Sequence, residues 1–145
     1  MDFTELFAFA QRHAVLSLGL AVVTVALVYT EIARLFRPYK AATPRQLVHL
    51  INAENALVVD VSALVEFEKG HIVGAKHLLP SQFDPAAKPF AGAQERPVAV
   101  VDRTGMASGE IAAKLAKAGF KRVYWLDGGL AAWTAADLPL AKGRA

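Results

Sequence analysis

The sequence predicts an α/β domain, a parallel sheet flanked by helices, preceded by one N-terminal transmembrane helix. Two observations carry this prediction. Residues 14–30 contain no charged side chain, and further along the chain short apolar runs alternate with stretches of helical periodicity. Such runs are typical of strands buried on both faces, and their alternation with helices indicates a parallel sheet with right-handed crossovers.

Composition limits the classes of function. The chain has 145 residues, a formal net charge of +3 and no cysteine. The absence of cysteine excludes disulfides, zinc–thiolate sites and thiol catalysis by this chain. The basic residues are dispersed rather than gathered in runs, so we expect no nucleic-acid partner. We also expect no cofactor. In particular, we expect no metal at His71 and His77, because these two histidines have no third ligand in view.

The membrane prediction rests on the N-terminal segment. Residues 1–13 place Phe3, Leu6 and Phe7 at helical spacing, which favours a short interfacial segment. We assign residues 14–35 to a transmembrane helix through which the protein contacts the membrane. Its uncharged part spans roughly 25 Å at about 1.5 Å per residue, and the flanking apolar residues lengthen it.

Two other interpretations of this apolar stretch stay open. A cleaved signal peptide usually begins with a positive region, whereas this one contains Asp2 and Glu5, and no small-x-small cleavage site follows. A buried core helix is the second alternative, although the stretch lacks a polar face.

Basic residues are distributed unevenly around the span. Arg12 precedes it, whereas Arg34, Arg37, Lys40 and Arg45 follow it. The positive-inside rule therefore predicts a single-pass protein of the inner (plasma) membrane, with the N-terminus outside and the following domain in the cytoplasm.

A linker at residues 36–42 is expected to lead into a domain at residues 43–140, followed by a tail at 141–145. Thr43 is the predicted N-cap of the first helix of this domain, and Pro44 its first residue. The predicted elements, in order, are a helix at 44–52, a strand at 56–61, a short helix at 63–69, a short strand at 76–79, a long surface loop at 81–95, a strand at 98–101, a helix at 108–118, a strand at 122–126 and a final helix at 130–136.

The clearest functional signal is the loop that joins the strand at 98–101 to the helix at 108–118. Ligands of such sheets bind beyond the carboxyl ends of the strands, and a glycine-containing turn into a helix points several N–H groups at one place. We expect these N–H groups and Arg103 to stabilise the negative charge of Asp102, which then repels incoming anions. The loop consists of Asp102, Arg103, Thr104, Gly105, Met106, Ala107 and Ser108.

Several motifs, in a fixed order, resemble the rhodanese homology domain. They are T-P-x-x-L at 43–47, V-V-D-V at 58–61, E-F-x-x-G-H-I-x-G-A at 66–75, R-T-G-M-x-S at 103–108, A-G-F-x-x-V-Y-x-L-D-G-G at 118–129 and A-A-W at 131–133. The resemblance implies the rhodanese fold for about residues 39–140. The single N-terminal helix, with F-x-x-R-H at 9–13, also resembles the YibN-type membrane-anchored rhodanese-like proteins of bacteria.

The same resemblance implies a departure at the active-site loop. Active rhodaneses begin this loop with a cysteine that carries a persulfide, whereas this chain has Asp102 there, and Ser62 stands where an arginine is usual. A carboxylate cannot form the required S–S bond, so we predict no catalytic residue. Carboxylate catalysis through Asp102 is the alternative, but enzymes of that kind usually recruit a metal with further acids, and the loop has none.

We therefore expect a membrane-anchored, catalytically inactive rhodanese-like domain that acts as a cytoplasmic protein-binding or scaffolding module, with a protein partner. The alternative is an accessory role in sulfur transfer, in which the domain docks a sulfur-carrier protein at the membrane. Outside the loop, we expect a packing or capping role for His71, a hydrogen-bond partner for buried Asp60, and core positions for Trp125 and Trp133.

Overall fold

The computed structural model describes residues 2–144, and the chain divides into two compact units, Met1–Arg37 and Pro38–Ala145. The first unit contains helices α1 (Phe3–Arg12) and α2 (Ala14–Leu35). The helical geometry breaks at His13, with φ −122° and ψ 48°. The bounds of α2 coincide with those predicted for the span, and the helix is long and apolar enough to cross a membrane by length and composition.

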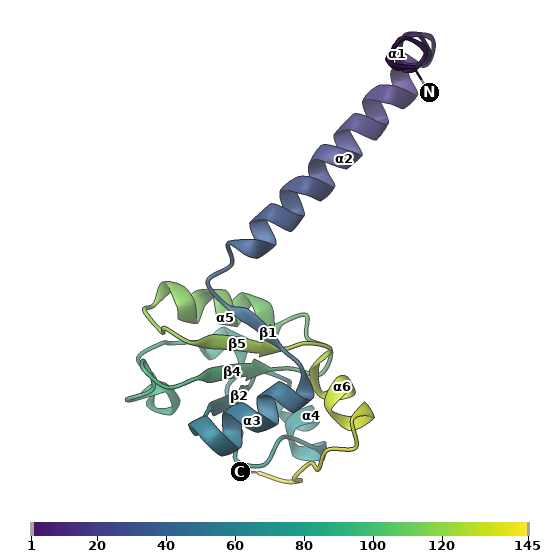
Figure 1. Ribbon diagram of the computed structural model, residues 1–145. Coiled ribbons are helices and arrows are strands. Elements are labelled where there is room, and N and C mark those ends of the chain that lie inside the picture. Colours follow the sequence, from purple (N-terminus) through teal and green to yellow (C-terminus); the bar gives the residue numbers. More distant parts are fainter. Residues whose placement is uncertain (1, 145) are drawn as a thin grey trace. The chain divides into compact units, whose positions relative to one another are not determined.

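The second unit contains the predicted parallel sheet, which confirms the fold class (Figure 1). Its five strands lie in the order β1-β5-β4-β2-β3, and every neighbouring pair is parallel. The strands are β1 (Lys40–Ala42), β2 (Leu57–Asp60), β3 (Lys76–His77), β4 (Val98–Val101) and β5 (Val123–Leu126).

Helices cover both faces of this sheet. The helices of the second unit are α3 (Pro44–Glu54), α4 (Leu64–Lys69), α5 (Ser108–Lys117) and α6 (Gly129–Ala135), with 3₁₀ turns η1 (Pro80–Gln82) and η2 (Lys88–Phe90). Val59 and Val100 pack on the side of α5, together with Leu115. Val58 and Val101 face the other way, in a cluster that contains residues of α3, α4 and α6. This alternation buries the strands on both faces, as their apolar sequences predict.

The start of α3 has the predicted cap. Thr43 Oγ1 accepts a hydrogen bond from Gln46 N at 3.3 Å, and Gln46 Oε1 accepts one from Thr43 N at 2.9 Å. Pro44 occupies the first helical position, where a missing N–H costs nothing. This reciprocal capping fixes the direction in which the chain leaves β1.

Three segments differ in extent from the predicted elements. The expected linker at 36–42 ends in strand β1, which pairs with β5, so the sheet begins before the predicted domain. The predicted strand at 76–79 is reduced to Lys76–His77. The loop at 81–95 contains η2 and most of η1 and buries Phe90 completely, because this ring packs edge-on against Phe120 on the α5 side of the sheet.

Candidate functional site

The backbone of the loop between β4 and α5 is held by the start of α6. Leu130 N donates to Asp102 O at 2.9 Å, and Ala131 N donates to Arg103 O at 3.2 Å. Gly129 has φ +61°, and a Cβ at this position would lie 2.5 Å from Asp102 O. Only glycine therefore permits this approach of two backbone segments.

The turn within the loop is equally crowded. Gly105 has φ +87°, and a Cβ there would lie 3.1 Å from the ring of Trp125 and 3.2 Å from Gly128 N. Gly105 thus faces β5 and the turn that follows it. Trp125 is half-buried: its ring packs against the core and lies next to Gly105 of the loop.

The carboxylate of Asp102 lies inside the loop. The residue is 6% exposed, and Oδ2 accepts a hydrogen bond from Ala107 N at 3.1 Å. Oδ1 is buried and has no hydrogen-bond partner among residues 2–144, and the same holds for Ser108 Oγ. One backbone N–H, rather than a ring of them, therefore holds the carboxylate.

Arg103 does not pair with Asp102, contrary to expectation. Its guanidinium forms an ion pair with Glu66 of α4, which also accepts a hydrogen bond from Lys69 at 3.1 Å. The hydrogen bond from Lys69, together with the positive charge of Arg103, holds the pKa of Glu66 below its ordinary value. The reason for the difference is burial: Asp102 is enclosed by its own loop, whereas Arg103 is exposed and meets Glu66 at the rim.

A pocket of about 610 Å³ lies beside the loop. Glu66, Lys69 and Arg103 line its charged side, and Leu130 and Leu140 contribute apolar surface. Glu66 was missed by the sequence analysis as a site residue because it lies 37 positions before Arg103, in a different crossover.

The outer surface of the loop is open to solvent. Thr104, Met106 and Ala107 are exposed, and Met106 has 86% of its surface accessible. This part of the loop therefore presents an apolar side chain to solvent rather than to the core.

A second buried carboxylate ends the neighbouring strand β2. Asp60 Oδ1 accepts a hydrogen bond from Ser62 N at 2.9 Å. This is the hydrogen-bond partner that was predicted for this buried carboxylate. Burial raises the pKa of Asp60, and the interaction with Ser62 and the charges of His77 and His71 offset this only in part. Oδ2 has no hydrogen-bond partner within residues 2–144.

His71 and His77, at which no metal was expected, both make structural contacts. His71 Nδ1 donates to Phe67 O at 2.8 Å, and the two rings stack with centroids 3.9 Å apart, which confirms the packing role. His77 Nε2 donates to Ser62 O at 2.8 Å. Trp133 is buried and donates to Pro139 O at 3.0 Å. Residues 2–144 contain no group of three or more His, Cys, Asp or Glu side chains arranged to hold a metal.

Comparison with known proteins identifies the fold. Residues 43–136 match the family model of the rhodanese-like domain. The chain belongs to the rhodanese-like domain family. It is 38% identical over 141 residues to the uncharacterized protein YibN of Escherichia coli K12, an alignment that covers 97% of this chain and 99% of YibN.

Other relatives are named as sulfurtransferases. Thiosulfate sulfurtransferase GlpE of Pseudomonas putida GB-1 is 38% identical over 98 residues, covering 67% of this chain and 86% of GlpE. The crystal structure of a thiosulfate sulfurtransferase from Pseudomonas aeruginosa superposes with a TM-score of 0.65 at 28% identity. That superposition covers 72% of this chain and 20% of the longer protein. This rhodanese-like chain contains no cysteine.

The approach of α6 to the loop predicts that Gly129→Ala destabilises the domain. The left-handed φ alone costs about 1–3 kcal/mol, and the contact with Asp102 O adds to it. Urea unfolding of the full chain in detergent micelles measures the change. Gly109→Ala in α5 is the matched control, because a Cβ there meets no atom within 4 Å. Equal stability of the two variants would contradict the proposed role of Gly129.

The burial of Asp60 predicts a pH dependence. Its folded-state pKa is raised above the unfolded value of about 3.9, so its contribution to stability falls as pH rises from about 4 through the folded pKa. Asp60→Asn removes this loss. The free energy of unfolding of the variant minus that of the wild type should therefore increase as the pH rises through this window, by at most about 1.4 kcal/mol per pH unit. Exposed Asp127→Asn is the control, and a parallel gain there would refute the assignment to Asp60.

Proposed function

We propose that this rhodanese-like protein is anchored in the inner membrane by α2 and that its domain is catalytically inactive, serving as a cytoplasmic protein-binding or scaffolding module. The observation that carries this proposal is the buried carboxylate of Asp102 inside the active-site loop. The chain has no cysteine at that position or elsewhere.

The chemistry of sulfur transfer supports inactivity. A persulfide intermediate requires a sulfur nucleophile that can form an S–S bond, and a carboxylate oxygen cannot replace it. The carboxylate also occupies the loop: Asp102 Oδ2 takes the hydrogen bond of Ala107 N, and its negative charge disfavours thiosulfate or phosphate in the same place.

The surface around the loop supports a binding role. Exposed Met106 lies in the same loop as Arg103, which lines the pocket of about 610 Å³. Apolar surface beside charged side chains is typical of protein interaction sites. We place the partner contact at this surface, which the fold keeps in shape although its catalytic group is gone.

Features of the first unit support the anchor. The side chains of α2 are exposed along its length, and an apolar helix of 22 residues needs a lipid or protein environment. The excess of basic residues after the helix favours the cytoplasm for the domain.

The second candidate function is an accessory role in sulfur transfer, in which the domain docks a sulfur-carrier protein without carrying sulfur itself. The similarity to GlpE, which is named a thiosulfate sulfurtransferase, favours this candidate. The loop and pocket surface is the same in both proposals, and only the class of the partner differs.

We expect the full chain in detergent micelles to transfer no sulfur from thiosulfate to cyanide above the level of Asp102→Ala. Thiocyanate formation measures the transfer. Asp102→Cys asks separately whether the loop still supports a thiolate, with a mass gain of one sulfur atom after incubation with thiosulfate as its readout. Turnover by the wild type that Asp102→Ala abolishes would overturn the inactivity.

Crosslinking in native membranes, followed by mass spectrometry, is expected to capture a membrane protein through the loop surface. A photoreactive residue at Met106 reports contacts of that surface, and one at Gln82, exposed in η1, is the control. Sulfur-carrier proteins as the main products would favour the accessory role over scaffolding. The absence of any product specific to position 106 would refute both.

A further inference from the structure

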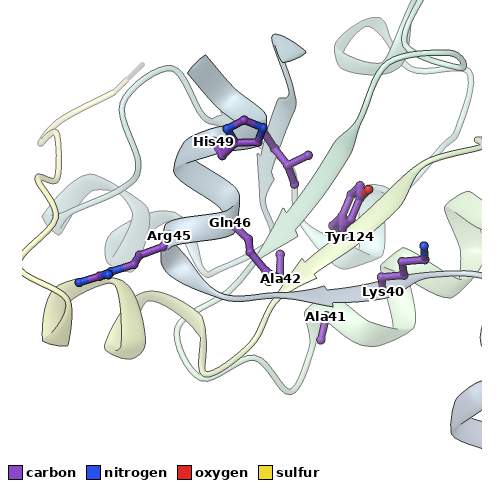
Figure 2. Close-up of a pocket in the computed structure, with 8 residues that line it drawn as sticks. Lys40, Ala41, Ala42, Arg45, Gln46, His49 and Tyr124 are labelled. Atoms are coloured by element: carbon purple, nitrogen blue, oxygen red, sulfur yellow. The ribbon is translucent and has the colours of Figure 1, made fainter. Parts of the chain in front are cut away.

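A second pocket, of about 440 Å³, lies between β1 and α3 and takes no part in the loop site (Figure 2). It is at the edge of the sheet, because β1 is the end strand in the order β1-β5-β4-β2-β3. Its apolar lining includes Ala42 and Leu50, both buried, and Tyr124, which is half-buried. Its volume falls in the range of roughly 300–1,000 Å³ that is usual for small-molecule sites.

The polar lining of this pocket is basic. It includes Lys40, Arg45 and His49, all exposed, and none of its described lining residues is acidic. Figure 2 shows Lys40 extending from β1 beside Tyr124, with His49 on α3 across the pocket and Arg45 on the outer side of the helix start. Arg45 lies in the first turn of α3, where the helix dipole adds positive potential.

Lys40 and Arg45 have no acidic partner among residues 2–144, unlike several other cations of the domain. Lys69, Lys114 and Lys121 each form an ion pair with a glutamate. Within residues 2–144, neither Lys40 nor Arg45 forms an ion pair or a side-chain hydrogen bond. The pocket therefore offers unneutralised positive charge next to apolar surface, which suits an anionic group attached to carbon atoms.

Covalent connectivity limits where this pocket can lie. Lys40 is five residues beyond Leu35, the last residue of α2. A chain of that length spans at most about 18 Å. If α2 crosses the membrane, as proposed above, Lys40 stays within about that distance of the bilayer, where anionic headgroups attract basic residues by about 1 kcal/mol each.

We propose that this pocket binds the headgroup phosphate of an anionic membrane lipid, with Lys40 beside the phosphate, Arg45 adding positive potential from the outer side of the helix start, and the apolar lining facing the glycerol carbons. The proposal deepens the membrane-anchored function and rests on it for the source of the lipid. A free acidic peptide has the charge that the pocket requires, but only the lipid is held next to the pocket by the chain itself.

The test titrates the full chain, in neutral detergent micelles, with short-chain phosphatidylglycerol and follows the amide NMR signals of residues 40–50. We expect saturable shifts that phosphatidylcholine does not produce. Lys40→Ala combined with Arg45→Ala should weaken the binding roughly 30-fold, since each basic residue contributes about 1 kcal/mol. Lys88→Ala combined with Lys117→Ala removes the same charge elsewhere on the exposed surface and should leave the binding unchanged.

Four results would overturn the proposal. They are equal shifts with phosphatidylcholine, equal affinity for inorganic phosphate alone, saturation by hexaglutamate without any response to phosphatidylglycerol, and equal weakening by the control pair. Carbonate extraction of native membranes tests the anchor separately. A chain that is extracted yet binds phosphatidylglycerol in micelles overturns the anchoring and the membrane source of the lipid, but leaves the headgroup chemistry of the pocket standing.

Discussion

The end of β4 and the start of α6 meet backbone to backbone, and the whole carboxyl edge of the sheet depends on this contact. Gly129 permits it, and the N–H groups of Leu130 and Ala131 satisfy the carbonyls of the two residues that open the loop. No side chain of the loop takes part. This contact between backbones therefore does not depend on which side chain stands at position 102.

Two buried carboxylates lie at the carboxyl ends of the adjacent strands β2 and β4. In each of them, only one of the two oxygens has a hydrogen-bond partner among residues 2–144. Asp60 and Asp102 each accept one backbone hydrogen bond and leave one buried oxygen unpartnered. Buried polar atoms without partners cost stability. Arg103 and Lys69 are engaged with Glu66 at the rim instead.

The sequence revealed those parts of the fold that local patterns encode. Strands β2, β4 and β5 were predicted because burial on both faces produces continuous apolar runs. β1 was not predicted, since Lys40 and two alanines have no strand pattern, and only the pairing with β5 makes them a strand. In the site, the position of Asp102 followed from the order of motifs. The pairing of Arg103 with Glu66 could not be predicted, because it depends on how two crossovers meet in space.

The position of β1 has a consequence for biosynthesis. This strand is the first of the sheet to leave the ribosome, and its partner β5 is the last: Lys40 pairs with Tyr124. Domains form from their N-terminal end during translation, but long-range parallel pairing is slow because the intervening loop must close first. If α2 enters the bilayer as it emerges, the edge of the sheet stays unpaired at the membrane surface until nearly the whole chain has been made. The nascent domain would then have an open strand edge next to the lipid throughout its synthesis.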